Sequence, residues 1–261
     1  MNYCLRYSNN SKKLIKEAEE ISIIYDKNDV ELPAFIRKHP DKRINLIIES
    51  INIDNFDEFE VNKINLIHEA MPEAQLYVCL YNYSKMEVIK PDIKARMDAL
   101  KLPWFSGLFA HTWDQLHYLI SLGVSDIYVV EDLCFELPAV AKECHKHNIR
   151  VRVIPNVAQS SINASAPLKK FFIRPEDIDI YEPYIDTIEF WGELRQQDVY
   201  YKIYHDKKEW YGNLKEIIFS FDLDFDNRCV LPIFGKSRLD CGKKCLKGGH
   251  CCICDHLYNI S

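Results

Sequence analysis

The chain has 261 residues, of which 48% are hydrophobic and 12% aromatic, so it can bury a sizeable core in one large domain or two small ones. Its formal net charge of −6 argues against a broad nucleic-acid-binding surface, although it is compatible with a local basic patch. No apolar run has the length of a signal peptide or a bilayer span, and we therefore expect a cytoplasmic protein with no membrane partner.

Short runs rich in β-branched and aromatic residues recur along the chain and predict β-strands. Several are apolar throughout, which is typical of strands buried on both faces of a parallel sheet. The runs lie at residues 3–7, 21–26, 44–50, 74–80, 105–111, 126–132, 149–156, 170–175 and 187–191.

Helical patterns separate several of these runs. In residues 111–123, Thr112 and Gln115 fit a capping box and Gly123 ends the pattern. In residues 135–148, Pro138 stands near the first turn and Asn148 is the expected stop. Residues 174–185 predict a shorter helix with two acids near its start.

The alternation of strands and helices predicts an α/β fold made of βα units. Nine strand candidates suit a TIM-like (β/α)8 barrel over residues 1–215, with one surplus run or an extra edge strand. A doubly wound open sheet is the alternative, but no G-x-G-x-x-G sequence follows the first strand. Residues 216–261 are expected to form a small cysteine-rich, metal-binding C-terminal extension.

Polar residues follow nearly every apolar run, where a barrel carries its catalytic groups. Solvated loops and helix caps also place polar residues there, so position alone does not assign a role. His111 can transfer protons near neutral pH, and Arg174 can bind a carboxylate or phosphate. Glu131 and Glu189 can act as general bases or as partners of the arginine. These four residues and Asn156 are the candidate catalytic residues, and we predict that they converge on one face of the barrel.

No established catalytic signature accompanies these candidates. The chain contains no G-x-S-x-G, H-E-x-x-H or G-x-x-x-x-G-K-[ST] sequence. The residues alone therefore do not reveal a reaction.

Nine of the ten cysteines fall into two groups, and Cys229 stands apart from both. Four lie in or beside apolar runs and are expected to be buried as small hydrophobic residues: Cys4, Cys79, Cys134 and Cys144. Five others crowd near the C-terminus in the spacing C-x3-C-x5-C-C-x-C: Cys241, Cys245, Cys251, Cys252 and Cys254.

This crowding predicts a metal centre held by four thiolates. The expected ligands are Cys241, Cys245, Cys251 and Cys254. Thiolates are soft ligands and favour zinc or an iron–sulfur cluster over magnesium or calcium. Four other residues are alternatives to one of these ligands: Cys252, Cys229, His250 and His256. Thiols with no metal are the other alternative, which the reactivity of exposed cysteines disfavours.

Residues 174–189, RPEDIDIYEPYIDTIE, resemble the part of peptidase U32-type proteins in which a Pro-x-Asp-Leu segment opens a helix and an Asp and a strand bearing Glu follow. The corresponding residues here are Pro175, Asp177, Ile178, Asp186 and Glu189. The resemblance implies a TIM-barrel-like domain and a [4Fe–4S] cluster on four cysteines. It also implies RNA hydroxylation, ubiquinone hydroxylation or, by older assignment, proteolysis of collagen. This chain departs from the family in reading Phe-Trp-Gly after Glu189 and in bunching its cysteines at the C-terminus.

Two functions follow from these observations. The first is a U32-like metal-cluster enzyme, with a [4Fe–4S] cluster, that acts on RNA or a small aromatic molecule or as a peptidase. The second is a zinc-stabilised binding or accessory protein that recognises a partner protein without catalysis.

Overall fold

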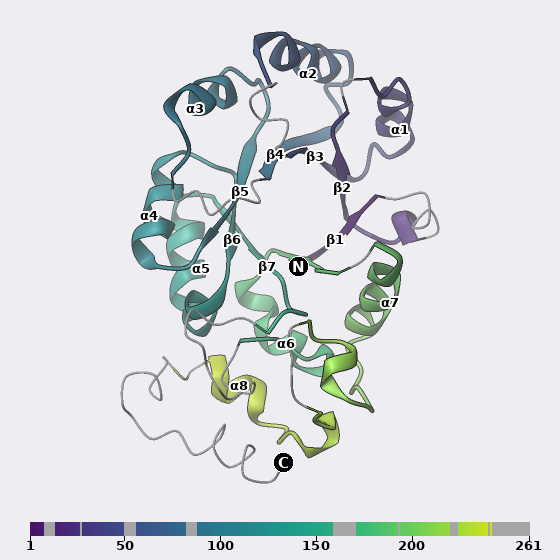
Figure 1. Ribbon diagram of the computed structural model, residues 1–261, viewed down its shortest axis with the longest axis vertical. Helices are drawn as coiled ribbons and strands as arrows, with labels where there is room; N and C mark the ends of the chain where they lie inside the picture. Colours follow the sequence, from purple (N-terminus) through teal and green to yellow (C-terminus); the bar gives the residue numbers. More distant parts are fainter. Residues whose placement is uncertain are drawn as a thin grey trace.

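Eight parallel strands form a closed barrel in the part of the chain that the structure describes (Figure 1). This computed structural model describes residues 1–7, 14–26, 28–49, 56–81, 88–158, 171–192, 194–219, 224–239 and 241. The strands are β1 (Asn2–Arg6), β2 (Glu20–Ile24), β3 (Arg43–Glu49), β4 (Gln75–Tyr81), β5 (Trp104–Ala110), β6 (Asp126–Val129), β7 (Arg150–Val153) and β8 (Thr187–Glu189). They pair in chain order, and β8 pairs back with β1. The predicted (β/α)8 barrel is confirmed, and the open sheet is excluded.

Helices surround the barrel, as Figure 1 shows. They are α1 (Leu32–Lys38), α2 (Glu58–Ala70), α3 (Pro91–Asp98), α4 (Trp113–Ser121), α5 (Leu137–Lys146), α6 (Ile178–Tyr181), α7 (Leu194–His205) and α8 (Phe234–Leu239). Short 3₁₀ helices lie at Leu14–Lys16, Glu131–Glu136, Pro175–Asp177, Glu182–Tyr184, Leu214–Glu216 and Asn227–Cys229. Across the described ranges, no helix combines the length and apolar character that crossing a bilayer requires.

Two of the helix signals read from the sequence are confirmed. Thr112 and Gln115 form both hydrogen bonds of a capping box at the start of α4. Beyond α5, Asn148 adopts a left-handed conformation with φ of 58°, which ends the helical path.

One predicted strand is absent in its described part. Residues 171–174 of the run 170–175 form no strand, and the Ile173 N–H donates to the Pro155 carbonyl, just beyond β7, at 3.0 Å. The run is apolar because it is buried: Phe171 packs edge-to-face on Phe135 and Tyr181, with ring centroids 5.4 and 5.9 Å apart. A short apolar run does not by itself distinguish a strand from another buried segment.

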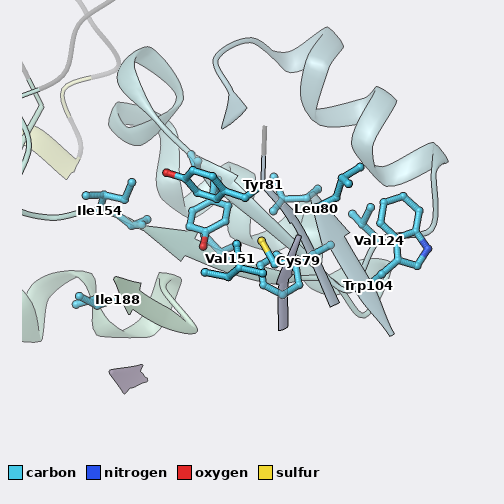
Figure 2. Close-up of a cluster of buried hydrophobic side chains, with 14 of the residues drawn as sticks. Cys79, Leu80, Tyr81, Trp104, Val124, Val151, Ile154 and Ile188 are labelled. Carbon is cyan, nitrogen blue, oxygen red and sulfur yellow. The ribbon is translucent and has the colours of Figure 1, made fainter. Parts of the chain in front are cut away.

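Side chains alternate between the helical layer and the barrel lumen along each strand. Leu80 and Trp104 belong to the apolar core, part of which Figure 2 shows. The residues that follow them in β4 and β5, Tyr81 and Phe105, are also buried, so both faces of these strands are covered. The four cysteines expected in apolar surroundings are all buried: Cys4, Cys79, Cys134 and Cys144.

The described part of the predicted C-terminal extension contacts the barrel directly. The Phe219 N–H donates to the Asn156 carbonyl at 2.7 Å, and the Ala158 N–H donates to the Phe219 carbonyl at 2.8 Å. The rings of Phe172 and Phe234 pack at a tilt in a second small apolar cluster, with centroids 5.7 Å apart. The C-terminal segment thus packs beside the carboxyl end of β7.

Candidate functional site

A cavity of about 220 Å³ opens at the carboxyl ends of the strands. We call it the Glu189 cavity. Arg6, Tyr81 and Glu189 are the last residues of β1, β4 and β8, and all three line it. Phe109 and Tyr128 add two rings from β5 and β6, and Phe190, Trp191 and Gly192 follow β8 along the wall. This is the end of a (β/α)8 barrel at which active sites lie.

A break in regular strand pairing brings one of these rings to the cavity. Between β5 and β6 the register shifts between Ser106 and Phe109. The Phe109 ring then meets the Tyr128 ring edge-to-face, with centroids 5.6 Å apart. Irregularities of this kind commonly redirect a side chain beside a site.

The Glu189 carboxylate accepts hydrogen bonds from three side chains. Its Oε1 accepts from Arg6 Nε at 3.3 Å. Its Oε2 accepts from the Tyr128 hydroxyl at 2.5 Å and from Arg152 Nη2 at 3.4 Å. The Glu189 side chain is only 5% exposed, whereas that of Arg6 is 25% exposed. The arginine therefore forms the more accessible polar part of the cavity.

Burial and the nearby charges fix the protonation states of two of the donors. Burial, followed by the negative charge of Glu189, raises the pKa of Tyr128 well above its ordinary value, so this phenol keeps its proton at neutral pH. Burial alone would lower the pKa of Arg6, but Glu189 and Tyr81 raise it overall. The cavity therefore presents a phenol and a permanent cation beside the carboxylate.

Below the cavity, the barrel lumen holds a group of charged side chains, which we call the lumen network: the buried Glu20, Arg43, Asp126 and Arg152, and the partly exposed Arg150. Glu20 Oε1 lies 2.6 Å from Arg150 Nη2, and Glu20 Oε2 lies 2.8 Å from Arg152 Nη1. Asp126 Oδ2 lies 2.6 Å from Arg43 Nη2. Arg152 has no exposed surface and contacts Glu20, Asp126 and Glu189, so it joins the lumen network to the cavity.

The arginines of the lumen network hold Glu20 in its charged form. Burial would raise the pKa of Glu20, but the guanidinium groups of Arg152, Arg43 and Arg150 bring it far below its usual value. Aromatic rings provide further contacts, because the Arg43 guanidinium stacks over the Tyr77 ring at 3.5 Å.

The structure places the five predicted catalytic residues in different surroundings. Glu189 lines the cavity. Asn156 is fully buried and bonds to the backbone of Trp191 in the cavity wall. The described lining includes neither Arg174 nor His111. Glu131 begins the 3₁₀ helix that follows β6.

Two of these residues have other contacts near the carboxyl ends of the strands. Arg174 pairs with Asp177, at 2.6 Å from Nε to Oδ2 and 2.9 Å from Nη2 to Oδ1. It also donates to Asn227 Oδ1 at 3.4 Å, so it ties the C-terminal segment to the barrel. The backbone N–H of His111 donates to Gln115 Oε1 at 2.9 Å, next to the start of α4. Glu189 is thus the one predicted residue whose side chain is placed in the cavity lining, and a catalytic role for the five remains a prediction.

Reasoning from the sequence missed Arg6, Tyr128 and Arg152. A usable signal was present, because Arg6 and Arg152 interrupt apolar strands with a charge in YCLRY and IRVRV. A charged residue inside a strand that is buried on both faces needs a partner of opposite charge or a hydrogen-bond acceptor nearby.

Cys241 is the one predicted metal ligand that lies within the described residues. It follows α8, its N–H donates to the Arg238 carbonyl at 3.3 Å, and its side chain packs partly buried against the main core. The other predicted ligands, Cys245, Cys251 and Cys254, lie outside the described residues. Among the residues that the structure does describe, no three His, Cys, Asp or Glu side chains are grouped to hold a metal ion.

Comparisons with known proteins do not assign this chain to a family. No protein-family model matches the chain, and no curated protein matches its sequence. A glycerophosphodiester phosphodiesterase from Parabacteroides distasonis is 10% identical with a TM-score of 0.46, over 79% of this chain and 97% of that one. A tryptophan synthase complex from Pyrococcus furiosus is 10% identical with a TM-score of 0.44, over 82% and 95%. These values are too low to transfer a reaction to this chain.

Proposed function

We propose that this chain is an enzyme that acts on one planar ring, a base of RNA or a small aromatic molecule, in the Glu189 cavity. The observation that carries the proposal is the meeting of a carboxylate, a guanidinium and a phenol in a cavity with aromatic walls. These groups come from β8, β1 and β6, and they lie at the carboxyl ends of the strands.

The size and the walls of the cavity favour a single ring. A volume of about 220 Å³ is smaller than the roughly 300–1,000 Å³ of pockets that hold drug-sized ligands. Tyr81, Phe109 and Trp191 offer flat apolar surfaces, and stacking on aromatic side chains is a general way to bind a base or another aromatic ring.

The polar groups of the cavity provide complementary chemistry. Arg6 suits an anionic group or a carbonyl oxygen on the ring. Glu189 and Tyr128 form a hydrogen-bonded pair in which a proton can be accepted by one member and donated by the other. In this proposal Glu189 and Tyr128 are the catalytic residues, and Arg6 binds the substrate.

The proposal includes a metal centre on Cys241, Cys245, Cys251 and Cys254, for which the U32-like resemblance favours a [4Fe–4S] cluster over zinc. A cluster would supply one-electron chemistry, whereas zinc on four thiolates would be structural. The alternative function, a zinc-stabilised accessory protein without catalysis, needs no ligand in the cavity.

The test combines metal analysis with ligand binding. Anaerobically purified protein should be brown and contain iron and sulfide. Calorimetry should detect binding of at least one of three ring probes, namely benzoate, uridine and adenosine. Glu189→Gln should weaken that binding by about tenfold or more, since a hydrogen bond to a charged group is worth about 1.5–3 kcal/mol.

Glu60→Gln is the matched control. Glu60 is also buried and accepts a hydrogen bond from a tyrosine, Tyr25, at 2.7 Å, but it does not line the cavity. Its substitution should leave probe binding unchanged. Colourless protein with one zinc and no binding of any probe would favour the accessory protein and overturn the proposal.

A further inference from the structure

The cavity wall that carries Trp191 is held by one buried side chain. Asn156, just beyond β7, has no exposed surface. Its Nδ2 donates to the Trp191 carbonyl at 2.8 Å, and its Oδ1 accepts from the Trp191 N–H at 2.9 Å. The side-chain amide of Asn156 thus forms hydrogen bonds with both the backbone N–H and the backbone carbonyl of Trp191. Because these groups belong to two successive peptide units, the backbone is held on both sides of the Trp191 Cα.

The residue after Trp191 is fixed by its own conformation. Gly192 has φ of +125°, which side-chain-bearing residues rarely adopt. A Cβ at this position would lie 3.2 Å from the Tyr200 ring and 3.3 Å from the Phe219 ring. The wall therefore has little room to relax toward α7 or the C-terminal segment.

The other side of Asn156 is also fixed. Its carbonyl accepts from the Phe219 N–H at 2.7 Å. Asn156 thus stands between the C-terminal segment and the cavity wall, and it contacts both through hydrogen bonds.

We propose that Asn156 is a positioning residue that sets the place of the Trp191 indole in the Glu189 cavity and so determines which ring the cavity accepts. Trp191 as a residue is 38% exposed and lines the cavity, so its indole can stack on a bound ring, whereas Asn156 is not among the lining residues. The specificity part of this inference rests on the proposed function, whereas the positioning part does not.

The chain offers a matched control in Asn65, which is 7% exposed. Its Nδ2 donates to the Ala99 carbonyl at 3.1 Å, and its Oδ1 accepts from the Lys101 N–H at 2.8 Å. This amide makes the same kind of backbone clamp as Asn156, between α2 and the segment after α3, outside the cavity lining. Asn65→Ala therefore removes equivalent bonds without touching the wall.

The experiment uses the full chain labelled with 5-fluorotryptophan, whose Trp191 fluorine resonance is assigned with Trp191→Phe. Asn156→Ala should shift or broaden the Trp191 resonance, and it should weaken binding of the ring probe by about tenfold. Asn65→Ala should leave both readouts unchanged. Benzoate, uridine and adenosine are measured with each variant, and Asn156→Ala should reduce the ratio between the best and the worst probe.

An unshifted Trp191 resonance in folded Asn156→Ala would overturn the positioning role. Unchanged probe affinity and selectivity would overturn the specificity role. If Asn156→Ala does not fold, hydrogen exchange of the wild-type chain decides: the Trp191 amide should be protected, and exchange at the rate of an exposed amide would overturn the clamp. A wild-type chain that binds no probe contradicts the proposed function and the specificity role, while the resonance still tests the position of Trp191.

Discussion

Replacing Arg152 with methionine should destabilise the protein strongly, because it leaves buried carboxylates without their shared cation. Arg152 is fully buried and lies within 3.4 Å of Glu20, Asp126 and Glu189. Methionine replaces the aliphatic part of the arginine side chain and fits an apolar environment, so the main loss is the guanidinium group with its charge and hydrogen bonds. Breaking a buried ion pair by removing one partner costs about 3–5 kcal/mol.

Denaturant and thermal unfolding measure this cost. For a chain of this size, each kcal/mol lowers the melting temperature by about 2–4 °C, so Arg152→Met should lower it by about 6–20 °C. Arg228→Met is the control, since Arg228 is exposed and pairs with Asp226 at 2.5 Å on the surface. It should change the melting temperature far less, because exposed ion pairs contribute little.

The pH dependence separates charge from packing. The pKa of Glu20 is depressed in the folded state from its usual 4.5, so its contribution to stability is present above that value and is lost as the pH falls below it. Without Arg152 the depression is smaller, and the variant loses less on acidification. The stability difference between wild type and Arg152→Met should therefore be largest near about pH 7 and shrink below about pH 4. A difference that stays constant with pH, or one as small as that of Arg228→Met, would refute this reasoning.

Three further changes test the cavity and the tail. Tyr128→Phe removes the hydroxyl that donates to the cavity carboxylate and should cost about 1.5–3 kcal/mol in denaturant unfolding; an unchanged midpoint would contradict that bond. Gly107→Ala would place a Cβ 2.9 Å from the Tyr81 ring. The substitution should lower the free energy of unfolding by about 1–3 kcal/mol and weaken probe binding. Unchanged probe binding would contradict the placement of the Tyr81 ring in the cavity wall. The double variant Cys241→Ser and Cys245→Ser should abolish metal content and loosen residues 229–261 to proteolysis while the barrel stays folded; unchanged metal content would exclude this site.

The barrel could be predicted because its strands have apolar partners on their outer side. Helices cover the outward-facing residues, such as Leu80 and Trp104, so the runs are rich in large hydrophobic residues wherever a strand lies. Two helix ends could also be predicted, because the capping box of Thr112 and the left-handed conformation of Asn148 depend only on residues close in the sequence. The run 170–175 was misread because burial, and not strand pairing, makes it apolar.

The cavity was harder to predict because its parts meet only when the barrel closes. β1 and β8 pair through Cys4 and Glu189, which stand at opposite ends of the barrel sequence. The neighbour of Glu189 that matters, Arg6, therefore has no local sequence relation to it. Selecting the polar residues that follow predicted strands identified Glu189. The same criterion also selected Arg174, which pairs with Asp177 in the helical turn that directly follows it. Position after a strand predicts the face of a barrel better than it predicts the partner of a side chain.

The lumen network gives a physical reason to connect the inside of the barrel with the cavity. Barrel interiors of this kind are usually filled by branched apolar residues, and a buried ion network is weak evidence for stability because desolvating each charge is expensive. Here the network does not stop at the bottom of the lumen, since Arg152 reaches from Glu20 and Asp126 up to the Glu189 carboxylate. A carboxylate anchored from below by a buried cation keeps its orientation while Arg6, beside it, remains partly accessible. The proposed function requires such a fixed orientation before a ligand arrives, and under that proposal it is the reason why the barrel carries charges in place of an apolar core.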